Sequence, residues 1–77
     1  MRAKVVSIVS QVLGVEPAEI TDQTSPKEVE TWDSLRHMDL VLALEEEFGI
    51  RFSDEQILEL LNVGTIVQAV SAARSGG

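Results

Sequence analysis

The sequence contains no cysteine and no tyrosine, and its 77 residues include one histidine and one tryptophan. Without cysteine the chain has no disulfide framework, no thiolate nucleophile and no zinc ribbon. A single histidine is too little for a histidine-rich metal site. Trp32 and two phenylalanines are the only aromatic residues, which leaves few rigid walls for an enclosed enzyme pocket. We therefore expect a small domain that is stabilised by one apolar core alone.

Long apolar runs and basic residues are also scarce. The longest uninterrupted apolar run, Leu40 to Leu44, is far shorter than the roughly 20 residues that a membrane span needs. No signal-peptide-like stretch stands near the N-terminus, so we expect a cytoplasmic chain without membrane contact. Thirteen acidic residues against six basic ones give a formal net charge of −7. This charge argues against nucleic acid as a partner and favours basic protein surfaces.

The first part of the sequence has the periodicity of a helix. Apolar residues at the spacing of one buried stripe predict a helix from Arg2 to Leu13, which ends at Gly14. The stripe consists of Val5, Ile8, Val9, Val12 and Leu13. Residues 15–32 show no period and predict a long ordered crossover with a short turn from Pro17 to Ile20. Val15, Ile20 and Val29 are expected to attach this crossover to the core.

Three further helices are predicted after the crossover. Asp33 is placed to cap a helix from Ser34 to Phe48, which ends at Gly49. Ser53 and Gln56 have the spacing of a capping box, which predicts a short helix from Asp54 to about Leu61. Asn62 can cap a last helix, and residues 75–77 are expected to form a flexible tail.

The predicted fold is all-α: a four-helix bundle of three longer helices and one short helix, with a long first loop, in a single domain over residues 1–77. Its expected core consists of Ile8, Val12, Leu40, Leu44, Phe48, Ile57, Ile66 and Val70.

The predicted helix over residues 34–48 carries two apolar faces. At about 100° per residue, one face holds the core stripe of this helix, while Leu35, Met38 and Leu42 form a second stripe well away from it. The second stripe either packs under the crossover or the third helix, or it is exposed. Residues 33–62 also hold eight acidic and two basic residues. Exposure would suit docking of basic partners on a face formed by Leu35, Met38, Asp39, Leu42, Glu45 and Glu46.

Ser34 opens this helix directly after Asp33. Helix N-termini favour phosphate groups through free N–H groups and the helix dipole, although the adjacent carboxylate opposes this. A serine at position 34 is, by its residue type alone, equally compatible with a helix cap or a solvated hydroxyl that carries no group. A catalytic triad of Ser34, His37 and Asp33 or Asp39 lacks the glycine-bearing nucleophile elbow of hydrolases. The acidic segments lack the spacing of a calcium-binding loop, and no alternating strands support a ubiquitin-like fold.

Several segments together resemble the acyl carrier protein family over nearly the whole chain. They are Gly14-Val15, Glu19-Ile20, Asp33-Ser34-Leu35, the run from Ala43 to Phe48, Ser53-Asp54-Glu55 and Asn62-Val63-Gly64. The resemblance implies that phosphopantetheine from coenzyme A is attached to Ser34, between Asp33 and Leu35. The thiol of that group would carry acyl intermediates as thioesters, which fits a chain without cysteine.

The resemblance also implies a non-catalytic, monomeric carrier. Its partners would be a phosphopantetheinyl transferase and acyl-loading, acyl-transferring or synthase enzymes with basic docking surfaces. Fatty-acid carriers have Leu-Gly and one further residue before the signature, where this chain has Glu30-Thr31-Trp32. Arg36 stands where an acidic or small polar residue is common. These departures favour a specialised, polyketide-like or other secondary pathway. An aminoacyl or peptidyl carrier, and a carrier-like interaction module that is never loaded, stay open as alternatives.

Overall fold

The computed structural model describes residues 1–76 of the chain. It contains the helices α1 (Arg2–Leu13), α2 (Ser34–Phe48), α3 (Asp54–Leu58) and α4 (Val63–Gly76), and a short 3₁₀ helix η1 (Pro17–Glu19). The described part of the chain has no strand, so the all-α prediction is confirmed. None of its helices is long and apolar enough to cross a bilayer. The predicted tail overlaps the end of α4, while Gly77 lies outside the described residues; its flexibility stays a prediction.

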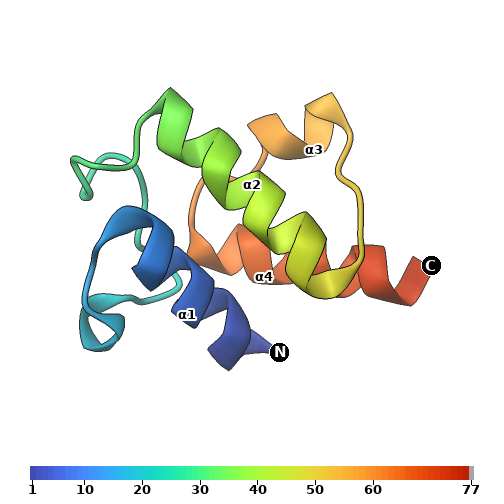
Figure 1. The fold of residues 1–77 in the computed structure, drawn as a ribbon, viewed down its shortest axis with the longest axis horizontal. Helices are drawn as coiled ribbons and strands as arrows, with labels where there is room; N and C mark the ends of the chain where they lie inside the picture. The colour runs from blue at the N-terminus through green and yellow to red at the C-terminus, as the bar shows by residue number, and fades with distance from the viewer. Residues whose placement is uncertain (77) are drawn as a thin grey trace.

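Three helices form the body of the domain. Helices α1 and α2 pack against each other, and both contact α4. Figure 1 shows α2 crossing in front of α4, with the crossover at one end of the molecule and α3 at the other. The start of α2 therefore lies at a corner of the fold, where the crossover ends, and residues 33–36 are exposed there.

The ends of the helices follow the local rules that the sequence suggests. Gly14 and Gly49 adopt left-handed conformations, with φ of 70° and 63°, and end α1 and α2. Ser53 and Gln56 form both bonds of the capping box. The Asn62 Oδ1 accepts from the Thr65 N–H at 2.8 Å and caps α4.

Helix α3 is shorter than predicted, because it ends at Leu58 rather than near Leu61. The Thr65 Oγ1 accepts from the backbone N–H groups of Leu61 and Asn62, each at 3.1 Å. These bonds bind residues 61 and 62 to the first turn of α4. A continued α3 helix would need the same N–H groups for itself.

The core differs from the predicted one in its membership. Leu40, Leu44, Ile66 and Val70 are fully buried as predicted. The other predicted members are only partly buried and pack against the edge of the core: Ile8, Val12, Phe48 and Ile57. Helix α1 instead buries the narrower line Val5, Val9 and Leu13, because α1 meets α2 and α4 along a single seam. Further buried residues come from the connections and from α2 and α4: Ile20, Trp32, Val41, Ile50, Phe52, Leu60 and Val63.

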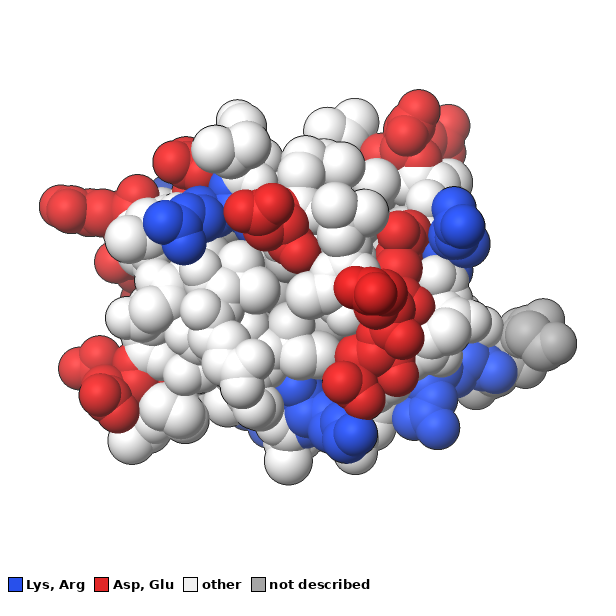
Figure 2. Space-filling model, in the orientation of Figure 1, with Lys and Arg blue, Asp and Glu red and all other residues white. Residues whose placement is uncertain are grey.

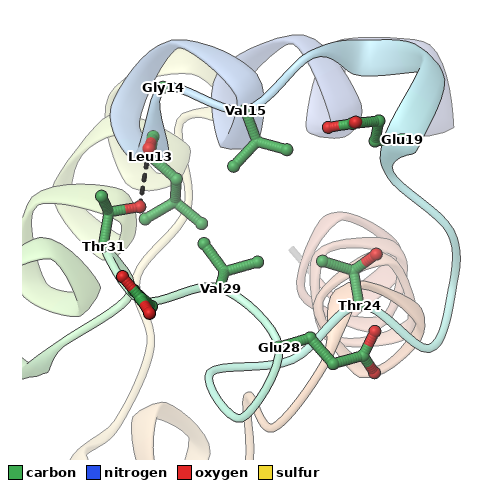
Figure 3. A pocket seen from close by; sticks show the side chains of 9 residues that line it. Leu13, Gly14, Val15, Glu19, Thr24, Glu28, Val29 and Thr31 are labelled. Atoms are coloured by element: carbon green, nitrogen blue, oxygen red, sulfur yellow. Dashed lines mark hydrogen bonds between the residues drawn. The ribbon is translucent and has the colours of Figure 1, made fainter.

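The crossover is ordered by backbone and side-chain bonds to the helices. The N–H groups of Val63 and Gly64 donate to the carbonyls of Thr24 and Asp22, at 3.1 and 2.9 Å. The Thr31 hydroxyl donates to the Leu13 carbonyl at the end of α1, at 2.7 Å (Figure 3). These bonds connect the crossover to both α4 and α1, as expected for an ordered segment.

We predict that Leu44→Ala and Leu42→Ala differ sharply in stability although both remove the same atoms from α2. Leu44 is fully buried, whereas Leu42 is exposed. Leu44→Ala should lose about 2–5 kcal/mol of unfolding free energy, as buried leucine truncations do. Leu42→Ala should change it by less than about 0.5 kcal/mol. Urea denaturation followed by circular dichroism measures both, and equal midpoints would show the core assignment to be wrong.

Candidate functional site

The first residues of α2 place a serine hydroxyl on the surface. Ser34 is exposed and is the first residue of the helix. The Asp33 carboxylate does not face Ser34 freely, because its Oδ1 accepts from the Arg36 N–H at 2.8 Å and caps the helix. The Asp33 carbonyl accepts from the His37 N–H at 2.8 Å and starts the helical bonding. The negative charge expected to oppose a phosphate is thus directed at the first turn of α2.

Arg36 ties the start of α2 to the end of α1. Its Nη1 donates to the Val12 carbonyl at 2.9 Å, one of the last carbonyls of α1. A cation is favourable at this end of a helix. The Thr31 hydroxyl binds the next carbonyl, that of Leu13. Thr31 and Arg36, which stand on either side of the Asp-Ser-Leu signature in sequence, therefore fix its position against α1.

A chain of hydrogen bonds crosses from the crossover to α3. The indole Nε1 of Trp32 donates to the Nδ1 of His37 at 2.9 Å, and the Nε2 of His37 lies 3.0 Å from the Ile57 carbonyl oxygen. The two rings are stacked, with centroids 6.1 Å apart and an interplanar angle of 24°. We call this arrangement the Trp32–His37–Ile57 bridge. Both ring nitrogens of His37 are engaged, so neither is available as the general base that a hydrolase would need next to Ser34.

A groove of about 550 Å³ opens beside Ser34, between the start of α2 and α3. We call it the Ser34 groove. Its inner wall contains Trp32 and Leu60, which are buried, and its rim carries the exposed residues Met38, Leu58 and Leu61. Pro26, Asp33, His37 and Ile57 complete the lining. Leu58 and Leu61 were not among the predicted site residues, although both lie off the apolar stripes that the core uses.

A second hollow of about 390 Å³ lies between the end of α1 and the crossover (Figure 3). Val15 and Val29 point into it, and Glu19, Glu28 and Glu30 also line it. The hydroxyls around it are committed elsewhere, since the Thr31 Oγ1 binds the Leu13 carbonyl and the Thr24 Oγ1 accepts from the Thr21 N–H. This hollow therefore offers no unengaged hydroxyl, and the Ser34 groove is the better candidate site.

The second apolar stripe of α2 is exposed. Leu35, Met38 and Leu42 have exposed fractions of 72%, 45% and 57%. The alternative that these residues pack under the crossover or α3 is therefore wrong. Asp39 and Glu46 are exposed beside the stripe. Figure 2 shows acidic side chains along the line that α2 follows in Figure 1, with uncharged surface between them.

Two of the three consecutive glutamates at the end of α2 have partners inside the domain. The half-buried Glu45 accepts from the Phe52 N–H through its Oε2 at 2.9 Å. Glu47 pairs with Lys4 of α1 at 2.8 Å. Glu45, which the sequence suggested for the partner face, therefore also holds the connection between α2 and α3. Asp39 and Glu46 are the carboxylates of that face for which the structure gives no such role.

Comparison with known proteins decides the family. The model of a family described as a phosphopantetheine attachment site matches residues 3–70. The chain belongs to this family. Within it, the chain is 33% identical over 64 residues to an acyl carrier protein of Helicobacter pylori (strain G27), a match that covers 83% of this chain and 82% of that protein.

Solved structures of the phosphopantetheine-attachment family agree with the fold. The chain is similar to the holo acyl carrier protein of Geobacter metallireducens, with a TM-score of 0.86, 30% identity and coverage of 96% of this chain and 85% of that one. It is similar to the acyl carrier protein of Thermotoga maritima, with a TM-score of 0.80, 30% identity and coverage of 96% and 86%. The chain is thus an acyl carrier protein that takes phosphopantetheine. Other enzymes act on what it carries, and it is not itself a catalyst.

We predict that Glu45→Ala destabilises the domain and Glu46→Ala does not, although both remove one carboxylate at the end of α2. Glu45→Ala leaves the Phe52 N–H without its charged acceptor and should lose about 1.5–3 kcal/mol. Glu46→Ala should stay within about 0.5 kcal/mol of the wild type. Amide hydrogen exchange at Phe52 should become faster in the first variant only. Unchanged exchange at Phe52 in Glu45→Ala would contradict the assigned bond.

Proposed function

We propose that phosphopantetheine is attached to Ser34 and that the chain then delivers acyl groups, held as thioesters, to partner enzymes. The observation that carries this proposal is the exposed Ser34 hydroxyl at the start of α2 and on the edge of an apolar groove. Other serines are less suited to attachment. The Ser10 hydroxyl donates to the Val15 carbonyl at 2.6 Å, and the Ser53 hydroxyl is part of the α3 capping box.

The residues around Ser34 fit the group that the family attaches. A phosphate on the Ser34 oxygen would stand at the N-terminus of a long helix, where free N–H groups and the dipole favour negative charge. Asp33 and Leu35 flank the attachment point, with Asp33 turned into the helix as its cap. The Ser34 groove offers apolar surface beside it. When bound, the group supplies a thiol, which this cysteine-free chain lacks.

The proposed partner face lies on α2 next to Ser34. Its apolar part is the exposed stripe of Leu35, Met38 and Leu42, and Asp39 and Glu46 supply its charge. The apolar part would seat in a socket of the partner, while the carboxylates would steer basic surfaces of the transferase and of the acyl-loading and acyl-transferring enzymes. The contact has to be weak, because a carrier leaves each enzyme after delivery.

We further propose that the chain is a monomeric, cytoplasmic carrier in a specialised pathway. Three features near the signature support the specialised pathway: Glu30-Thr31-Trp32 in place of Leu-Gly and one further residue, Arg36 bound to the end of α1, and Trp32 bound to His37. The Trp32-Asp33 pair favours acyl over aminoacyl or peptidyl cargo.

Loading of Ser34 can be tested without knowledge of the native pathway. After incubation with coenzyme A, Mg²⁺ and a promiscuous phosphopantetheinyl transferase, the wild type should gain the mass of one phosphopantetheine. Ser34→Ala should stay folded and gain none, since a surface hydroxyl contributes little to stability. Ser53→Ala, the matched control at another helix start, should be loaded like the wild type. A wild type that is never loaded would favour the interaction-module alternative, and loading of Ser34→Ala would contradict the proposed site.

The partner face can be tested with the same transferase. Asp39→Asn combined with Glu46→Gln should lower the association rate severalfold and flatten its dependence on salt, because steering by exposed charges is screened by ions. Met38→Ala should instead shorten the lifetime of the complex, with little change in its salt dependence.

The control for the charge variant removes the same two charges elsewhere, as Glu16→Gln combined with Glu19→Gln, and should leave the rates unchanged. Surface plasmon resonance at low and high salt gives both rates. If the α2 variants and the control behave alike, the transferase does not bind this face.

A further inference from the structure

The Ser34 groove is closed toward the interior of the domain. Its inner wall is Trp32, which is 3% exposed and belongs to the core cluster, together with the buried Leu60. The same core cluster contains Leu40, Leu44 and Ile66, which are fully buried. A group in the groove therefore has apolar surface on one side and solvent on the other. A passage from the groove toward the core would have to run between α2 and α3, whose residues line the groove.

The Trp32–His37–Ile57 bridge spans that passage. An indole N–H can only donate, so the His37 Nδ1 accepts and the proton of the neutral ring lies on Nε2. That Nε2–H donates to the Ile57 carbonyl of α3 at 3.0 Å. The neutral ring thus satisfies both of its partners at once, and it joins Trp32 before α2 to Ile57 in α3.

Opening the passage is costly. Helix α3 has five residues, none of them fully buried, so packing alone holds it weakly. An acyl chain that enters between α2 and α3 has to separate His37 from the Ile57 carbonyl and move the Trp32 ring out of the core. Each step leaves a partly buried donor or acceptor without a partner, and such groups cost more than an average hydrogen bond contributes.

We infer that Trp32 and His37 are specificity-determining residues, which confine the carried acyl group to the Ser34 groove and keep it out of the core. This inference rests on the proposed attachment at Ser34. A long unbranched alkyl chain gains little in an open groove, because one side of it stays in water. The carrier therefore takes short or polar acyl groups, which lose nothing by staying outside.

The reactivity of a short and a long thioester tests this directly. Butyryl and octanoyl groups are loaded on Ser34 from their coenzyme A thioesters, and cleavage by hydroxylamine is followed by mass spectrometry. In the wild type the two thioesters should be cleaved at equal rates. His37→Ala lacks the ring that spans the passage, and in this variant octanoyl should be cleaved roughly tenfold more slowly than butyryl. That factor is expected if about two methylene groups leave water.

Two further variants separate the role of the bridge from a loss of packing. His37→Gln keeps one acceptor and one donor and should restore equal rates. Val67→Ala trims a partly buried residue of α4 that packs against the core and does not line the groove, and it should behave like the wild type. Protection of octanoyl in the wild type would overturn the inference, and so would equal rates in His37→Ala.

A second readout uses the only tryptophan of the chain. The Trp32 indole N–H gives a single NMR resonance. It should shift only slightly when butyryl is exchanged for octanoyl, because a group that lies against Trp32 in the groove leaves the bond to His37 intact. A large shift with octanoyl alone would show that the long chain has displaced Trp32 and would overturn the inference.

The same resonance can be observed without any enzymatic loading. Because the chain has no cysteine, Ser34→Cys provides a unique thiol for butyl and octyl iodoacetamides. Failure of the transferase to modify Ser34 would count against the proposed function, while this chemical tether would still test the groove. Normal loading with a buried octyl chain would contradict only the role of Trp32 and His37.

Discussion

The burial of one face of α2 against α1 and α4 is the constraint on which the rest of the structure depends. The chain has no disulfide to hold it, so the seam that contains Leu40 and Leu44 has to provide much of its stability. That requirement fixes the rotation of α2 about its axis. It leaves Leu35, Met38 and Leu42 on the surface, and it puts Ser34 at a corner of the fold. One face of α2 thus stabilises the fold by its burial, while another face of the same helix stays accessible to partners.

Polar contacts then fix what surrounds the start of that helix. Asp33 caps it, Arg36 binds the end of α1, and His37 connects Trp32 to α3. The first two hold the serine in place relative to α1. The third lines the neighbouring groove. Trp32 and Arg36, which depart from the pattern of fatty-acid carriers, are therefore among the residues that shape the surroundings of Ser34 in this chain.

Local signals in the sequence were sufficient for the ends of α1 and α2 and for the start of α3, whereas Ser34 as the attachment residue follows from the family resemblance and stays a prediction. Gly14, Gly49 and the Ser53–Gln56 capping box act within one turn of chain, so their effect can be predicted from neighbours alone. Burial of Trp32 could not be predicted, because it depends on His37 and α3 being brought beside a segment without periodicity. The Glu45 bond to Phe52 likewise forms only after the chain has turned back at Gly49. The early end of α3 follows because the cap of α4 takes the N–H groups of Leu61 and Asn62. Neither the apolar periodicity nor the spacing of the capping box reveals this.

The central claim is that this fold presents one serine, Ser34, for attachment. Tandem mass spectrometry of peptides from the loaded wild-type chain tests it most directly, because it locates the added group on a residue. We expect fragment ions that carry the phosphopantetheine mass on Ser34 in every loaded molecule. The same mass on Ser7, Ser25 or Ser53 would contradict it.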